Sequence, residues 1–167
     1  MLSLRNAPKL IAAVLSAAFS ALLLVASVPA QAAVTLKGDG IIRVKSQYPM
    51  AETVERLQKD IESKGIKFFS AIDQSQLGAA ANIKLNPSTL LIFGNPPLGI
   101  QFLTANPNAG LDWPVRLLVT QDNSGQVWAV YTDFAWIARR HNISNRDAAF
   151  KMASEVIASI VSSVQKK

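Results

Sequence analysis

The chain has 167 residues and carries 17 Lys and Arg against 11 Asp and Glu, which gives a net charge of +6. It has one His and no Cys, so disulfides are excluded and a zinc or iron site built from His and Cys ligands is not available. The basic residues are scattered and form no stripe interleaved with aromatic side chains, so nucleic-acid binding is not predicted. A metal site made only of carboxylates stays formally open, but the sequence predicts no metal and no other cofactor.

The chain begins with the pattern of a Sec-type signal peptide. Two basic residues, Arg5 and Lys9, precede an uncharged run over residues 10–28, and Pro29 and Ala30-Gln31-Ala32 follow. This order predicts cleavage after Ala32 and export, so that the protein is periplasmic or secreted. The uncharged run is also just long enough for an uncleaved membrane anchor. The small residues after Pro29 favour cleavage, after which we expect no stable membrane insertion.

Cleavage leaves residues 33–167, a length that suits a single domain with one hydrophobic core and no disulfides. Two of the 17 basic residues lie in the predicted signal, so 15 remain against 11 acidic residues and the net charge becomes +4. This excess is mild, and it gives no reason to prefer nucleic-acid binding.

The first part of the mature chain alternates strand and helix patterns. Residues 40–46 alternate apolar and basic side chains, which predicts a strand with one face on a core and one in water. Residues 50–64 have apolar side chains at helical spacing and predict a helix with one buried face. A second strand is predicted at 66–72, and Asp73 follows it, before a short Ala-rich helix at 74–81. The buried face of the first helix is predicted to consist of Met50, Val54, Leu57 and Ile61.

The apolar and β-branched run at 89–94 predicts a strand buried on both faces, because it does not alternate with polar residues. Phe93 and Gly94 end this strand, and Asn95 and two prolines follow. Glycine adopts backbone angles that other residues avoid and proline cannot donate to a ladder. We therefore expect a rigid turn at the sheet edge that presents the Asn95 side chain to a ligand. The alternative is a strand with a tight stop and no binding role.

The second half of the chain predicts a β-hairpin among helical segments. Residues 122–125 are turn-forming and join two β-rich runs, which is typical of an antiparallel hairpin. Asp133 and Asn145 are placed to cap a short and a long helix. The expected segments are one or two helical turns at 98–105, a loop at 106–110, strands at 115–121 and 126–132, and helices at 134–140 and 146–164.

The order of these elements predicts the fold class. Strands that follow one another without a long crossover pair antiparallel, and the two main helices would cover one face of the sheet. The sequence therefore predicts a two-layer α+β domain with the order β-α-β-β-β-β-α.

Several short pieces of the chain resemble the domain of unknown function 302 family (DUF 302). The most specific is Phe93-Gly94-Asn95-Pro96 placed before Leu111-Asp112-Trp113-Pro114. The resemblance implies a fold of the TATA-binding-protein-like (TBP-like) class and a homodimer, and it implies no established activity. Family members often have His after the strand-end Asp, where this chain has Gln74, so a His-dependent role is not carried over to that position. The matching pieces are 52–57, 71–73, 91–96, 111–114 and 138–141, within about residues 40–143.

Six residues are candidates for binding a small-molecule ligand, because they lie near the ends of predicted strands and helices or in the loops beside them. Four of them also have structural interpretations. Asp73 can cap a helix, Asp112 can hold a turn, Tyr131 can be an ordinary strand residue, and His141 can favour a helix C-terminus. The candidates are Asp73, Phe93, Asn95, Asp112, Tyr131 and His141.

Two functions from different classes are considered. The first is an exported, dimeric binding or interaction module with a small polar-lined pocket. The second is a small hydrolase or isomerase that uses Asp73 or Asp112 as base together with His141. The chain has no Gly-x-Ser-x-Gly elbow and no glycine-rich phosphate signature, so the sequence favours the first function and assigns no catalytic residue.

Overall fold

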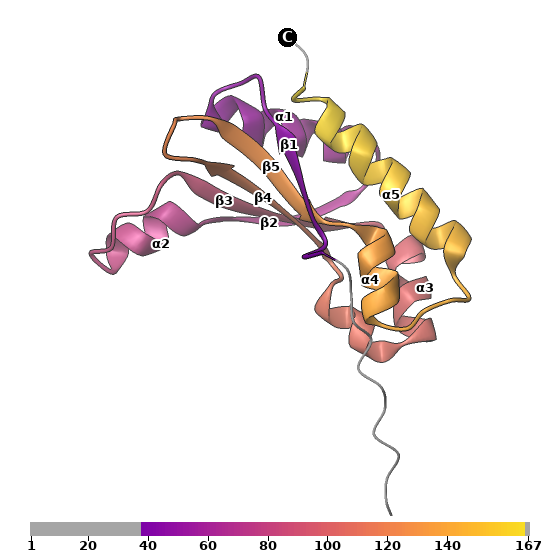
Figure 1. Ribbon diagram of the computed structural model, residues 1–167. Coiled ribbons are helices and arrows are strands. Elements are labelled where there is room, and N and C mark those ends of the chain that lie inside the picture. The colour runs from indigo at the N-terminus through magenta and orange to yellow at the C-terminus, as the bar shows by residue number, and fades with distance from the viewer. Residues whose placement is uncertain (1–37, 166–167) are drawn as a thin grey trace, which may run out of the picture. The chain divides into compact units, whose positions relative to one another are not determined.

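The computed structural model describes residues 38–165 (Figure 1), so the predicted signal peptide lies outside the described residues. Within them, no helix is long and apolar enough to cross a membrane. The strands are β1 (Ile41–Lys45), β2 (Lys67–Asp73), β3 (Ser88–Gly94), β4 (Val115–Gln121) and β5 (Val127–Thr132). The helices are α1 (Met50–Ser63), α2 (Gln74–Ala80), α3 (Pro96–Ala105), the 3-10 helix η1 (Pro107–Leu111), α4 (Phe134–Arg140) and α5 (Asp147–Ser162).

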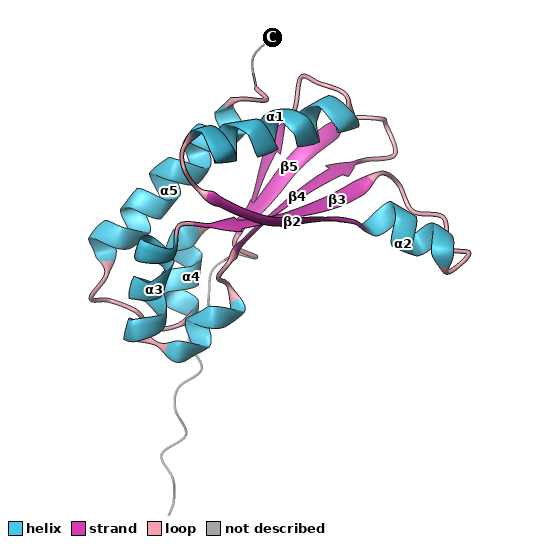
Figure 2. Cartoon of the chain, turned by 180° about the vertical axis from the view of Figure 1, so that it is seen from behind, coloured by secondary structure: helices cyan, strands magenta, loops and turns pink. Residues whose placement is uncertain are grey.

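The five strands form one sheet in the order β1-β5-β4-β3-β2, and every neighbouring pair is antiparallel. The two long helices, α1 and α5, lie on the same face of this sheet (Figure 2). Without the short helices, the chain order is β-α-β-β-β-β-α. The predicted α+β class and the antiparallel pairing are therefore confirmed.

The core lies between these two helices and the sheet. Leu57 and Ile61 of α1 are fully buried, as their helical spacing predicts. From the sheet, alternate residues point toward the helices, because side chains along a strand alternate between its faces. The fully buried side chains from the strands and α5 include Leu91, Leu117, Val119 and Ile160.

The strand β3 differs from its prediction. Leu91 and Phe93 are buried, but Leu90 and Ile92 on the opposite face are only partly covered. Among residues 38–165, no helix packs on that face (Figures 1 and 2), so within this part of the chain the apolar run faces a core on one side alone. We call this other side of the sheet the open face.

The residues after β3 also differ from their prediction. Pro96 and Pro97 do not form a turn at the sheet edge but begin α3, where proline suits the first helical turn because its missing N–H needs no partner there. Asn95 is the residue before this helix. Gly94 does not have a positive φ. The helix α5 is preceded by Arg146 and not by the expected cap Asn145.

The short helices lie at two opposite ends of the sheet. The helix α2 projects beyond one end, whereas α3 and α4 lie together at the other (Figure 1). The start of β4 lies at the α3 and α4 end, because Val115 pairs with Phe93 at the end of β3. Segments that follow β3 and β5 and precede β4 therefore meet at one end of the sheet.

Candidate functional site

The candidates Asp112 and His141 meet at the α3 and α4 end of the sheet. Asp112 directly follows η1, and His141 directly follows α4. Nε2 of His141 lies 2.6 Å from Oδ2 of Asp112, and the two side chains are 5% and 4% exposed. Because a carboxylate accepts hydrogen bonds, the imidazole Nε2 donates in this contact. The structure therefore brings these two of the six candidates together, with both side chains buried.

Two arginines complete a cluster around Asp112. Nη1 of Arg140 lies 3.0 Å from Oδ1 and 2.9 Å from Oδ2 of Asp112, and Nη2 of Arg116 lies 3.1 Å from Oδ1. The side chains of Arg116 and Arg140 are 51% and 41% exposed. We call Asp112, Arg116, Arg140 and His141 the Asp112 cluster. Two guanidinium groups face one carboxylate in it, so the cluster has an excess of positive charge.

Groups from neighbouring segments hold the cluster in place. The Arg116 Nη2 also donates to the backbone oxygen of Leu111 at 2.7 Å. Asn106 Nδ2 donates to the backbone oxygen of His141 at 2.8 Å, which ties the segment before η1 to the end of α4. The guanidinium carbon of Arg140 lies 5.4 Å from the ring centroid of Trp136, within cation–π range.

The members of the Asp112 cluster have different access to solvent. Asp112 is buried and its oxygens already accept from two guanidinium groups and one imidazole, so it positions other groups. Each arginine uses one terminal nitrogen for Asp112, and within residues 38–165 no group accepts from the other nitrogens of Arg116 or Arg140. The exposed sides of the two guanidinium groups are thus the part of the cluster that an external molecule can contact.

The sequence did not single out Arg116, Arg140 or Asn106 as site residues. Arg116 follows Asp112 by four residues and Arg140 directly precedes His141. These spacings predict contacts only inside a helix. The contact between Arg140 and Asp112 bridges 28 residues, and no local pattern indicates it.

The candidates Phe93 and Asn95 lie beside this region, at the end of β3. Phe93 is a core residue with 2% exposure, and Asn95 is exposed. Both line a narrow, mostly apolar cavity of about 30 Å³ together with Gly99 and Trp113. This volume has room for about one or two waters and not for a metabolite.

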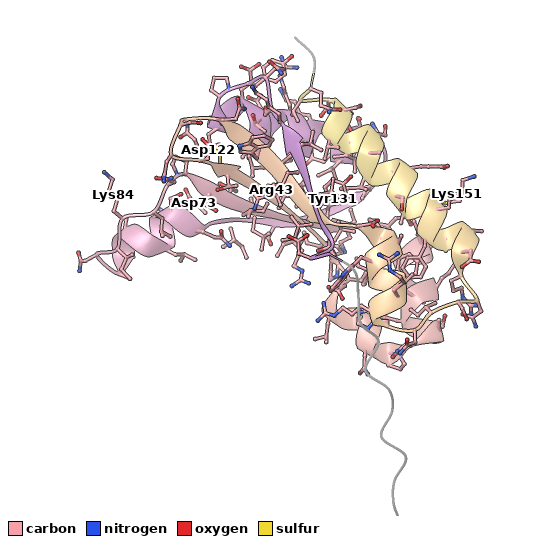
Figure 3. The ribbon with its side chains drawn as sticks, in the orientation of Figure 1. Arg43, Asp73, Lys84, Asp122, Tyr131 and Lys151 are labelled. Atoms are coloured by element: carbon pink, nitrogen blue, oxygen red, sulfur yellow. The ribbon has the colours of Figure 1, made fainter. Side chains whose placement is uncertain are left out.

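The candidates Asp73 and Tyr131 lie elsewhere. Asp73 pairs with Thr89 near the start of β3, the opposite end from Asn95, and its carboxylate accepts from Gln76 N at 2.9 Å as the cap of α2. Tyr131 packs against the core, and burial, with a smaller effect of the Asp133 charge, raises the pKa of its hydroxyl. Figure 3 shows Asp73 beside α2 and Tyr131 on the side of α5. The six candidates therefore do not converge on one pocket.

A larger groove of about 680 Å³ lies between α4 and the first turns of α5. Its lining includes Arg139, Ile143, Asp147, Phe150 and Lys151. It is open to solvent and holds none of the six candidates. Among residues 38–165, no group of three or more His, Asp or Glu side chains is close enough to hold a metal ion.

Three proteins of Brucella species are similar to this chain. One is "Fluoride-specific ion channel FluC 1" of Brucella suis biovar 1 (strain 1330), 37% identical over 113 residues, which are 67% of this chain and 44% of that protein. Another is "Fluoride-specific ion channel FluC 1" of Brucella abortus biovar 1 (strain 9-941), also 37% identical over 67% of this chain and 42% of that protein. The chain thus spans less than half the length of the curated relatives it matches.

A solved structure and a family model are also similar to the chain. The crystal structure of an uncharacterized conserved protein DUF302 from Bacillus stearothermophilus matches with a TM-score of 0.69 and 18% identity, over 76% of this chain and 99% of that one. At this identity the likeness concerns the fold alone. The family model "Domain of unknown function DUF302" matches residues 42–162, most of the chain. The chain therefore belongs to the DUF302 family, as its sequence motifs predicted.

Proposed function

We propose that this protein is an exported binding module whose ligand contacts the exposed sides of Arg116 and Arg140, without catalysis. One observation carries the proposal: the buried carboxylate of Asp112 holds two half-exposed guanidinium groups that come from separate elements. A surface ion pair contributes little to stability, and two arginines exceed what one carboxylate needs for charge balance. The arrangement is therefore suited to bind an external hydrogen-bond acceptor.

A hydrolase or isomerase that uses Asp112 with His141 is the second candidate function. The 2.6 Å contact between them supports it, since a carboxylate that orients an imidazole is common in acid–base catalysis. Against it, the His141 side chain is buried, at 5% exposure, which restricts the access of a substrate to the imidazole. A catalytic pair of Asp73 and His141 has less support, because Asp73 lies near the start of β3, at the opposite end of the sheet from His141.

A thermal-shift screen against a library of metabolites and metal salts tests these two functions. We expect at least one compound to raise Tm with no turnover of that compound. Turnover that disappears in His141→Gln, which keeps an N–H donor for Asp112, would favour the enzyme instead, provided that the variant keeps its fold by circular dichroism. A library without any stabilising compound contradicts the binding proposal.

Fluoride belongs in this library because the Brucella relatives are named as fluoride-specific channels. This chain spans less than half of each relative, so channel activity is not carried over to it. A fluoride-dependent rise in Tm at constant ionic strength would support a role of this chain near fluoride transport.

We also propose that residues 1–32 are a cleaved signal and that the mature protein is periplasmic or secreted. The sequence pattern of Arg5 and Lys9, the uncharged run, Pro29 and the small residues up to Ala32 supports this. Mass spectrometry of protein from the native host is expected to give a chain that starts at Ala33. A full-length species in the membrane pellet would contradict export as a free protein.

A homodimer is the proposed assembly. Support comes from α2 and the loop after it, where Leu77, Ile83 and Leu85 are 61%, 59% and 47% exposed, and from Ile72 on the adjacent open face at 37%. Exposed apolar side chains that lie together mark interaction surfaces.

The TBP-like class implied by the family resemblance stays a prediction.

A further inference from the structure

We propose that the Asp112 cluster binds a small oxyanion, meaning a carboxylate or phosphate group, between the guanidinium groups of Arg116 and Arg140. The inference rests on the proposed binding function and adds the chemical class of the ligand. Four observations support it: the distance between the two arginines, their fixed orientation, their free donors, and their excess charge.

The two guanidinium groups are close because they share an acceptor. Nη1 of Arg140 and Nη2 of Arg116 lie 3.0 and 3.1 Å from the same oxygen, Oδ1 of Asp112. The distance between these two nitrogens can therefore be no larger than the sum of their distances to Oδ1. An oxyanion with two or more oxygens spans such a separation and can accept from both groups at once.

Both guanidinium groups are fixed before any ligand arrives. Arg116 donates to Leu111 O as well as to Asp112, and Arg140 contacts both oxygens of Asp112 and lies near the Trp136 ring. Long side chains normally lose rotamer freedom when they bind a ligand. Here the buried Asp112 already restricts them, so binding an anion costs less entropy than at two free arginines.

The free donors and the charge favour an anion over a neutral ligand. Asp112, at 4% side-chain exposure, cannot accept from a ligand, whereas each arginine keeps Nε and one terminal nitrogen without an acceptor within residues 38–165. The side exposed to solvent therefore offers donors only. One carboxylate against two guanidinium groups leaves a net positive charge that an anion neutralises.

Arg139 provides a matched control on the same helix. It lies next to Arg140 in sequence but lines the groove between α4 and α5, with no contact to Asp112 among the described residues. A loss of its charge changes the net charge of the protein by the same amount as a loss of Arg140. The comparison separates binding at the cluster from general attraction of anions to a basic protein.

The experiment is a nuclear magnetic resonance titration of the whole mature protein with inorganic phosphate and, separately, with succinate. Ionic strength is kept constant with sodium chloride. We expect saturable shifts of the Arg116 and Arg140 Nε–H signals and of the Trp136 indole N–H with at least one probe, at millimolar concentration. No shift with either probe overturns the proposal, and so do shifts confined to Arg139 and Lys151 or to Arg43.

Variants test the assignment through affinity. Arg116→Gln and Arg140→Gln are each expected to lower the affinity for the tighter-binding of the two anions by about tenfold or more. This is the scale of one lost charge-assisted hydrogen bond. Arg139→Gln is expected to change the affinity by less than about twofold, because solvent and salt screen a surface charge that does not contact the ligand. Equal losses in all three variants would mean unspecific charge attraction and overturn the proposal. Arg140→Lys keeps the charge but not the planar fork, and it replaces Arg140→Gln if that variant does not fold.

The outcomes also separate this inference from the proposed function. If a neutral compound from the library binds and shifts Arg116 and Arg140 while phosphate and succinate do not, the binding function holds and the oxyanion inference fails. If neither the library nor the two anions bind, both fail.

Discussion

At the scale of single residues, Asp122 lies in the turn between β4 and β5 and has a strongly lowered carboxylate pKa. Its carboxylate accepts from Ser124 Oγ at 2.6 Å and from Trp128 Nε1 at 2.8 Å. Mainly through these two hydrogen bonds, the pKa of Asp122 falls from its ordinary value of 3.8 to about 2. The folded state thus favours the ionised carboxylate.

A lowered pKa makes the contribution of Asp122 dependent on pH. The stabilisation is fully present above the unfolded pKa of 3.8 and is lost as pH falls through about 2. We expect Asp122→Ala to lower Tm at neutral pH, and the difference from wild type to narrow between pH 3.8 and about 2. Circular dichroism melts over this range measure it. Asn123→Ala in the same turn is the control, because it does not titrate, and its difference from wild type is expected to stay constant.

Asn95 and Asp133 precede helices in the same way but differ in one hydrogen bond. Asp133 Oδ1 accepts from Ala135 N at 3.0 Å, whereas the side chain of Asn95 makes no such bond. We expect Asp133→Ala to lower the free energy of unfolding by about 1 kcal/mol and Asn95→Ala to change it by less than about 0.5 kcal/mol. Urea denaturation measures both. A cost for Asn95→Ala equal to that for Asp133→Ala would contradict the stated difference.

At the scale of elements, α3 contains Gly99, although alanine is normally more stable than glycine inside a helix. A Cβ on Gly99 would overlap the indole of Trp113, and one on Gly94 would come within 3.1 Å of the same ring. The two glycines therefore let Trp113 pack between the end of β3 and α3. This close approach is the role of Gly94, in place of the unusual backbone angles that its sequence position suggested.

This packing reverses the usual effect of replacing glycine in a helix. Alanine in place of glycine normally stabilises a helix by about 0.5–1 kcal/mol. We expect Gly99→Ala to destabilise the protein by about 1–3 kcal/mol, because the added methyl forces Trp113 to move. Gly110→Ala is the control, since its Cβ would meet only Leu103 at ordinary distance. Chemical denaturation with tryptophan fluorescence gives both values, and a stable Gly99→Ala with unchanged fluorescence would contradict the packing argument.

At the scale of the whole molecule, the sheet has one covered and one open face. Val130, Leu118, Leu90 and Ile72 lie side by side across four strands of the open face, and Arg43 continues this row on β1. The row ends at Ile72 near the end of β2, and the helix that follows, α2, projects beyond the sheet (Figure 1). Leu77 of α2 is also exposed. A second copy that covers this surface would bury apolar groups from both chains, as a two-fold interface does.

The proposed homodimer leads to a prediction about mass in solution. We expect light scattering to give the mass of two chains at tens of micromolar, and Leu77→Asp to shift it toward one chain by placing a charge in the interface. Met152→Asp is the control, because Met152 is 54% exposed on α5 and away from the open face. A mass of one chain for the wild-type protein, or an equal effect of both variants, would contradict the proposed surface.

The sequence by itself determined the order of the elements and their antiparallel pairing. These features depend on local patterns: the helical spacing of Leu57 and Ile61, the turn at 122–125, and the absence of long crossovers. The caps Asp73 and Asp133 were predictable for the same reason, because each acts within three residues of itself. The family also followed from short contiguous motifs.

Only the tertiary structure decided which faces are covered and which polar residues meet. The run at 89–94 has the same apolar pattern whether helices cover one face or both, so its sequence could not show that Leu90 and Ile92 face an open surface. The contacts of Asp112 with Arg140 and His141 join positions 28 and 29 residues apart. They exist because η1 and α4 come after different strands, β3 and β5, that finish at the same end of the sheet. Antiparallel pairing places Asp73 at the opposite end. Such distances are set by packing of the whole chain, which residue spacing does not encode.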